Sequence, residues 1–217
     1  MKYRSSKSAF TLIELLVVIS IILIASSIIF IGGNSGDGAK LSSSQRIVSG
    51  IAQGARGQAI LKNAETRLII YSDAGGNQDD EKKLRFFGIV YEEPADSGQF
   101  FAATQGTYLP EGIYFNEALS SANDWNVSRM NIDYPRQSAQ SGTSGEEYFY
   151  YQFNSNGTMA SGFDNNWLVL QAGTLKPDAS GALSVDFTDE ENAGLKSALI
   201  FRRTGTTTPV NDPSDID

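Results

Sequence analysis

The sequence contains no histidine and no cysteine among its 217 residues. Without histidine, the chain lacks the side chain that most often acts as a general acid or base near neutral pH. Without cysteine, it has no thiol nucleophile, no disulfide, no lipid-bearing cysteine and no zinc or haem site built on such ligands. These absences exclude most enzyme templates, so the sequence predicts no catalytic residue, no cofactor and no metal site.

Positive charge is scarce. The chain has 17 Lys and Arg against 25 Asp and Glu, a net charge of −8. A protein that binds nucleic acid by spreading cations over phosphates is therefore disfavoured. With 41% hydrophobic and 19% charged residues, the composition is that of a globular protein, and the length fits one domain with an appendage.

Long apolar runs are also scarce, and the main one covers residues 10–31. As a helix these 22 residues measure about 33 Å, against a bilayer hydrocarbon core of roughly 30 Å. Residues 1–9 carry three cations and no acid. By the positive-inside rule we expect the N-terminus in the cytoplasm and everything after Gly33 outside the membrane.

A secretory signal peptide is the alternative interpretation of this N-terminus. The apolar run is longer than the 7–15 residues usual in a signal peptide, and its small-residue patch, Ala25-Ser26-Ser27, lies inside the run rather than after it. Glu14 also argues against a signal peptide, because a carboxylate at the bilayer centre costs roughly 2.5 kcal/mol or more and is normally kept for a function.

Residues 8–19 read Ser-Ala-Phe-Thr-Leu-Ile-Glu-Leu-Leu-Val-Val-Ile. This motif resembles the class III signal of type IV prepilins and type II secretion pseudopilins. The resemblance implies that a prepilin peptidase cuts between Ala9 and Phe10, that Phe10 becomes an N-methylated first residue, and that Glu14 serves recruitment into a filament. The family usually has Gly where this chain has Ala9, which predicts slower cleavage. A plain signal anchor is the alternative.

Residues 32–38 contain four glycines, each of which costs about 1 kcal/mol relative to Ala inside a helix. We therefore expect a glycine-rich break at 32–38. Helical periodicity returns over 39–63, and Asp37 is the expected N-cap of this amphipathic helix.

After the helix, segments rich in aromatic and β-branched residues alternate with turn residues, which predicts a β-rich periplasmic domain over 64–205. The only helical pattern between these segments is a weak one at 189–196, so the sheets should be antiparallel and the fold α+β. A Ser/Gly/Gln-rich loop is expected at 137–146, and a flexible acidic tail at 206–217. The expected strands are 67–71, 84–91, 99–103, 112–116, 147–153, 167–171, 183–187 and 198–203.

Three short segments extend the resemblance. Residues 44–63 include an Ala-Arg-x-x-Ala-Ile core, residues 153–157 read Phe-Asn-Ser-Asn-Gly, and residues 200–205 read Ile-Phe-Arg-Arg-Thr-Gly. They are similar to segments of the GspH/FimT-type minor pseudopilins, in which a helix leads into the first strand. The segment 92–145 resembles nothing of that family.

Other clusters have alternative readings. Five oxygen-bearing side chains at 73–81 are a candidate calcium loop, although their spacing is not that of an EF-hand and a solvated turn is favoured. The adjacent acids Glu92-Glu93 and Glu146-Glu147 are candidates for a glycosidase pair, but neighbours on a strand point to opposite faces. The candidate calcium ligands are Asp73, Asn77, Asp79, Asp80 and Glu81.

The aromatic run 148–153 fits a stacking platform or core packing. We favour core packing, with Phe149, Tyr151 and Phe153 on the inner face of a strand and Tyr148 and Tyr150 on the other.

The resemblance predicts a non-enzymatic structural subunit of a type II secretion pseudopilus or a type IV pilus. Its expected partners are the prepilin peptidase, other pseudopilins in a helical filament, an inner-membrane assembly platform and the lipid bilayer. A competence pilin that binds DNA during uptake is the alternative, with Arg202-Arg203 as the place to look for DNA contacts. A secreted enzyme with an uncleaved anchor is a third.

Overall fold

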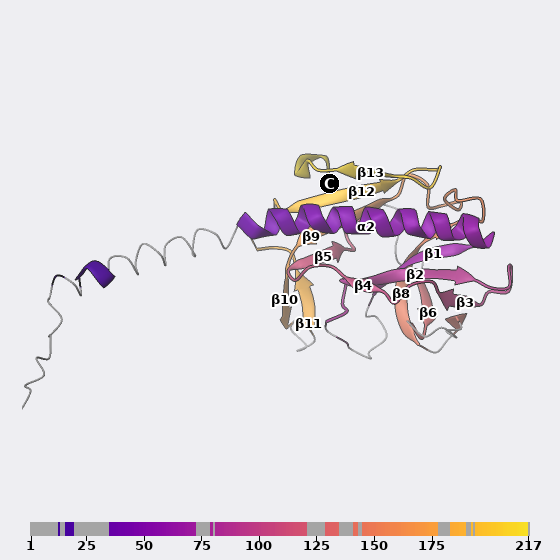
Figure 1. Cartoon of the computed structure of the whole chain (residues 1–217), viewed down its shortest axis with the longest axis horizontal. Helices are drawn as coiled ribbons and strands as arrows, with labels where there is room; N and C mark the ends of the chain where they lie inside the picture. The colour runs from indigo at the N-terminus through magenta and orange to yellow at the C-terminus, as the bar shows by residue number, and fades with distance from the viewer. Residues whose placement is uncertain are drawn as a thin grey trace, which may run out of the picture.

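The computed structural model describes residues 13, 16–19, 35–72, 79, 81–120, 129–134, 141–142, 145–177, 183–189, 192 and 194–216. Within them, one long helix, α2, lies across two antiparallel sheets (Figure 1). The fold is α+β with a pilin-like arrangement, as the sequence predicts.

The helix α2 runs from Ser35 to Lys62 and contacts strands of both sheets. Its buried face recurs at helical spacing and consists of Leu41, Val48, Ala52, Ala55 and Ala59. Since helices in proteins are stabilised mainly by packing of such a face, the sheets hold α2 in place despite its five glycines.

The start of α2 corrects the expected glycine break. Gly36 and Gly38 are helical, so residues 35–38 belong to α2, and Asp37 lies inside its first turn rather than at its N-cap. There the Asp37 carboxylate is 2.8 Å from Lys40 Nζ and complements the positive end of the helix dipole. Residues 32–34 lie outside the described residues, so a break at those positions stays a prediction.

The larger sheet contains seven strands in the order β3-β2-β1-β8-β6-β7, with β4 paired to β2. Its central strand β1 pairs on both sides, so that Leu68 lies opposite Ile89 of β2 and Tyr151 of β8. The strands are β1 (Thr66–Tyr71), β2 (Phe86–Glu92), β3 (Phe100–Ala102), β4 (Thr107–Tyr108), β6 (Arg129–Ile132), β7 (Ser141–Gly142) and β8 (Glu146–Phe153).

The smaller sheet has the order β13-β12-β9-β5, and a separate hairpin is formed by β10 and β11. Every strand pairing within the described residues is antiparallel, which confirms that prediction. The eight expected strands are present, within three residues at each end, whereas β4, β6, β7, β10 and β13 were not predicted. The strands are β5 (Ile113–Asn116), β9 (Trp167–Ala172), β10 (Thr174–Pro177), β11 (Leu183–Asp186), β12 (Lys196–Phe201) and β13 (Thr207–Val210).

The C-terminus corrects another expectation, because residues 206–216 are not a flexible tail. β13 pairs with β12, and a short 3-10 helix, η1 (Pro213–Asp215), follows. Ile216 is only 1% exposed and packs with Val169 and Ala198. Burial of Ile216 and the pairing of β13 with β12 order this segment, although its polar composition indicated disorder.

Two smaller expectations also change. The weak helical pattern at 189–196 forms turns in its described part, with Asn192 N bonded to Asp189 O and Leu195 N to Asn192 O. The expected loop at 137–146 contains β7 and the first residue of β8.

The main core lies between α2 and the two sheets. Phe149, Tyr151 and Phe153 of β8 point into it, whereas Tyr148 belongs to a second cluster on the opposite face and Tyr150 packs against that cluster. The predicted alternation of this aromatic run is therefore confirmed, and the run is core rather than a stacking platform.

Candidate functional site: the surfaces along α2

Little of the N-terminal motif falls within the described residues. Ile13 and Leu16 to Ile19 are helical, and their side chains are between 45% and 71% exposed. Ala9, Phe10 and Glu14 lie outside the described residues. In the part of the chain that the structure describes, no helix is both long enough and apolar enough to cross a bilayer.

The three segments that extended the resemblance meet at one point. Arg56 of α2 donates from Nε to the carbonyl of Gly157, at 3.3 Å, in the turn that follows β8. Gly205, in the turn between β12 and β13, packs against the same carbonyl. Both glycines have positive φ, 79° and 76°. We call this meeting point, formed by Arg56, Gly157 and Gly205, the turn junction. The turn junction has a structural role, because it holds two turns against α2.

Four arginines on this side of the molecule lack a carboxylate partner within the described residues: Arg46, Arg56, Arg202 and Arg203. Besides the Arg56 bond, Arg202 Nε donates to Thr208 Oγ1 at 3.0 Å. Two of these arginines lie on α2 and two follow β12. The sequence singled out Arg202 and Arg203 but not Arg46.

The paired acids of the sequence are held in structural contacts. Glu146 accepts from Lys82 Nζ and from the Tyr148 hydroxyl, each at 2.7 Å, while Glu147 accepts from Arg129 at 2.7 Å. Burial and then the bond to Glu146 raise the pKa of Tyr148. For Lys82, burial lowers the pKa, but the hydrogen bonds and charges of Glu146 and Asp79 together outweigh it and the net shift is upward. These carboxylates therefore balance cations rather than share a cleft.

The candidate calcium loop is only partly described, since residues 73–78 and 80 fall outside the described ranges. Asp79 is 3.5 Å from Lys82 Nζ and so contacts a cation of its own chain. Within the described ranges, no three acidic side chains gather as a metal site would require.

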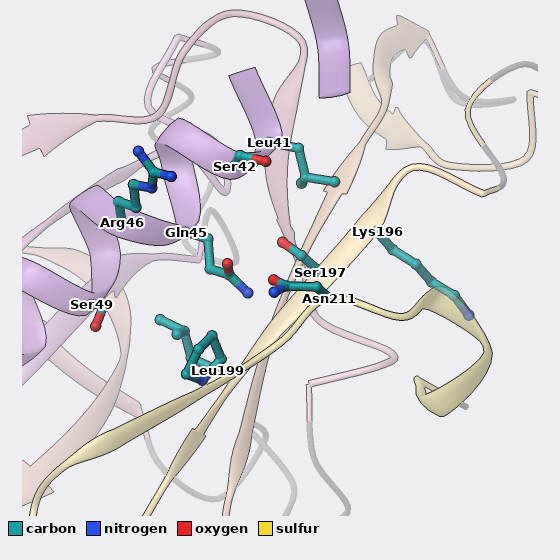
Figure 2. A pocket seen from close by; sticks show the side chains of 10 residues that line it. Leu41, Ser42, Gln45, Arg46, Ser49, Lys196, Ser197, Leu199 and Asn211 are labelled. Atoms are coloured by element: carbon teal, nitrogen blue, oxygen red, sulfur yellow. The ribbon is translucent and has the colours of Figure 1, made fainter. Parts of the chain in front are cut away.

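A groove of about 610 Å³ lies between the first half of α2 and the strands β12 and β13 (Figure 2). Gln45 is anchored in it, because its Nε2 donates to the carbonyls of Ala198 and Val210 at 2.9 and 3.2 Å. Ser197 is 5% exposed, and its hydroxyl has no hydrogen-bond partner within the described part of the chain. The lining residues are Leu41, Ser42, Gln45, Arg46, Ser49, Lys196, Ser197, Leu199, Pro209 and Asn211.

The sequence analysis missed this groove. The signal was present in α2, where Ser44 and Gln45 occupy the buried face between Leu41 and Val48. Polar side chains at core positions usually have a hydrogen-bonding role. The partners of Gln45 lie more than 150 residues away, however, and local periodicity does not reveal them.

Comparison with known proteins identifies a sequence motif at the N-terminus. The family model described as the prokaryotic N-terminal methylation motif matches residues 4–30. No curated protein and no solved structure gave a significant match to the chain. In this N-terminal segment the chain is similar to the type IV prepilin- and pseudopilin-like proteins, which are generally non-enzymatic structural proteins. The motif implies processing by a prepilin peptidase and a membrane-anchored precursor.

Proposed function

We propose that this chain is a minor pseudopilin, a structural subunit of a periplasmic type II secretion pseudopilus or a type IV pilus. The observation that carries the proposal is the methylation motif at residues 4–30, ahead of a domain built on one long helix and antiparallel sheets. The meeting of the three GspH/FimT-like segments at the turn junction supports that subtype, because it gives their Arg and Gly residues a common structural reason. The function needs neither cofactor nor catalytic residue.

The mechanism is assembly from the membrane. The apolar segment 10–31 holds the subunit in the inner membrane after cleavage between Ala9 and Phe10. Extraction toward the assembly platform and its siblings then replaces lipid contacts by helix–helix contacts. The exposed apolar side chains of Leu16 to Ile19 are a surface of the kind that such contacts cover. Because α2 is packed on both sheets, the folded domain moves together with the apolar segment when that segment leaves the membrane.

Glu14 gives the assembly its register. Cleavage creates an α-amine on Phe10 that is largely cationic at neutral pH. In a helix, four residues separate the amine from the Glu14 carboxylate by about 6 Å along the axis, so the two groups can pair within one subunit. The amine of an incoming subunit can equally pair with Glu14 of a neighbour. Either pairing neutralises a carboxylate that is costly in the bilayer, and the second also fixes the axial position.

The test is replacement of Glu14 by Ala and by the isosteric, uncharged Gln in the full-length protein. Both variants should be cleaved, inserted and folded like the wild type, but should be lost from sheared or cross-linked filament fractions. Glu111→Ala, which removes an exposed acid of the domain, is the matched control and should assemble normally. Recovery of both Glu14 variants in filaments at the wild-type level would contradict the role of Glu14.

DNA binding during uptake is the second candidate function. The observation that favours it is the set of four arginines along α2 and the β12–β13 turn that lack a carboxylate partner in the described ranges. A gel-shift assay at low ionic strength tests it, since phosphate contacts weaken steeply with salt. Binding that Arg202→Ala and Arg203→Ala together abolish would support it, and no binding even at low salt would exclude it.

A further inference from the structure

A smaller pocket, of about 410 Å³, lies at the two turns that meet in the turn junction. Two of the segments that the sequence singled out, 153–157 and 200–205, both contribute to its lining. The structural role of the turn junction accounts for the glycines of these segments, but it leaves the Arg203 side chain without a role. The lining residues are Asn154, Asn156, Thr158, Met159, Ala160, Ser161, Asp164 and Arg203.

The polar wall of this pocket is held in one conformation by its own hydrogen bonds. Asn154 Nδ2 donates to Thr158 Oγ1 at 3.0 Å and to the Met159 carbonyl at 3.1 Å. Asn156 Oδ1 accepts from the backbone N and the hydroxyl of Thr158, at 3.0 and 2.7 Å. Met159 N donates to the carbonyl of Arg203 at 3.0 Å, which fixes the second turn beside the first. These bonds use Nδ2 of Asn154 and Oδ1 of Asn156, so the other amide atom of each side chain is available to a ligand.

Two opposite charges line the pocket. Asp164 and Arg203 are both exposed, and neither side chain forms an ion pair with the other or with any other described residue. A lone phosphate or carboxylate would be attracted to Arg203 but repelled by Asp164, and a lone ammonium would meet the reverse. A ligand that carries one positive and one negative group satisfies both side chains at once. Guanidinium binds a carboxylate through two parallel N–H groups, and an ammonium donates three N–H groups to oxygens such as those of a carboxylate.

The rest of the lining limits the ligand further. None of the eight lining residues is aromatic, so the pocket offers no platform on which a base or a sugar ring would stack. Its apolar part consists of Met159 and Ala160, which gives little surface to a large hydrophobic group. The volume is near the lower end of the range usual for ligand pockets. The pocket therefore fits a small polar molecule with both charges, or the end of a larger one.

We propose that this pocket binds an α-amino acid head group, in which an ammonium and a carboxylate are attached to the same carbon. Arg203 binds the carboxylate, and Asn156 Nδ2 donates a further hydrogen bond to it. Asp164 binds the ammonium, which also donates to Asn154 Oδ1. The inference goes beyond the assembly role and does not depend on it. Such head groups occur on free amino acids and on the peptides of the cell wall, which a periplasmic domain would meet.

Calorimetric titration of the purified full-length protein in detergent tests the proposal. L-alanine should bind saturably, because it carries both charges of the head group. N-acetyl-L-alanine lacks the ammonium and L-alaninamide lacks the carboxylate, so each should bind at least about tenfold more weakly, as expected when a hydrogen bond to a charged group is lost. No saturable binding of L-alanine, or equal binding of the three compounds, would overturn the proposal and leave Asp164 and Arg203 as solvated surface charges.

Sedimentation with purified cell-wall sacculi distinguishes the two sources of the head group. A wall-borne head group should bring the wild-type protein down with the sacculi and leave Asp164→Asn and Arg203→Gln in the supernatant. If the ligand is a free amino acid, the wild-type protein should remain in the supernatant as well. Equal sedimentation of the wild type and both variants would exclude the wall as the ligand of this pocket. Neither assay involves a filament, so a failure of the proposed assembly role would leave both results unchanged.

The same two variants assign the charges in the titration. Asp164→Asn should weaken L-alanine binding at least about tenfold and remove the preference over N-acetyl-L-alanine, whereas Arg203→Gln should remove the preference over L-alaninamide. Both side chains are exposed and make no ion pair within the described residues, so the variants should fold normally, which circular dichroism checks. Asp96→Asn and Arg46→Gln, which neutralise exposed charges outside the pocket, are the matched controls and should bind L-alanine like the wild type. Unchanged binding by either pocket variant would overturn the proposed site.

Discussion

Gly205 packs against the carbonyl of Gly157 so closely that a β-carbon at position 205 would overlap that oxygen. Arg56 Nε donates to the same oxygen, and Met159 N donates to Arg203 O at 3.0 Å beside it. These contacts hold three segments together: the turn after β8, the turn before β13 and the second half of α2. The turn junction thus links both sheets to α2.

Gly205→Ala should therefore destabilise the domain strongly. Alanine at a φ of 76° costs about 1–2 kcal/mol, and displacement of the Gly157 carbonyl adds to this, for a loss of at least about 2 kcal/mol. Denaturant unfolding of the purified protein in detergent measures the loss. Gly112→Ala is the matched control, because its φ of 85° imposes similar strain while nothing lies within 4 Å of its β-carbon position. Equal losses in the two variants would show that the close approach is unimportant.

Gly50→Ala and Gly57→Ala should act in the opposite direction. Both glycines lie inside α2 on its exposed side, and a β-carbon at either would meet nothing within 4 Å. Each replacement should raise the free energy of unfolding by up to about 1 kcal/mol, because Ala has the higher helix propensity. The same unfolding measurement checks this. A loss of stability in either variant would mean that the space beside that glycine is filled in the folded protein.

Stability should fall at alkaline pH, and Tyr148 should account for part of the fall. Burial and then the bond to Glu146 raise the pKa of its phenol, so above about pH 10 the unfolded chain loses this proton while the folded chain keeps it. The unfolded state then binds fewer protons, and the free energy of unfolding decreases as pH rises. Tyr148→Phe should make the decrease shallower by up to about 1.4 kcal/mol per pH unit, measured by unfolding between pH 8 and 11. An unchanged slope would contradict the assignment.

Processing should begin the mature chain at Phe10 with a methyl group on its amine. Mass spectrometry of membrane-extracted protein measures the N-terminus. Ala9→Gly, which restores the usual residue before the cleavage point, should increase the processed fraction at early times after synthesis. Lys2→Arg leaves the leader charge unchanged and serves as the control. A chain that starts after Ala25, or one that always retains Met1, would refute cleavage by a prepilin peptidase.

Several features were predictable because they depend on short stretches of sequence. The buried face of α2 follows from residues three, four and seven positions apart, and the alternation of Phe149, Tyr151 and Phe153 follows from the period of a strand. The antiparallel sheets follow from the lack of strong helical patterns between strands. The short strands β4, β6 and β7 have too few residues to produce such a pattern.

The start of α2 and the fate of the C-terminus were predicted wrongly for a related reason. Glycine propensity indicated a break through Gly36 and Gly38, and polar composition indicated a flexible tail. At the start of α2, packing of the helix on the sheets outweighed the low helix propensity of glycine. At the C-terminus, pairing of β13 with β12 and burial of Ile216 outweighed the polar composition. Local preferences of about 1 kcal/mol per residue yield to tertiary contacts of this size.

The sequence by itself determined the N-terminal signal, because a bilayer and a peptidase both recognise a contiguous segment whose length, charge and order are written in residues 1–31. Only the tertiary structure decided where Arg56, Gly157 and Gly205 meet, and that Gln45 and Ser197 share a groove. These residues lie about 50 to 150 positions apart, and their contacts depend on how the helix and the two sheets pack together, which no local pattern along the chain specifies.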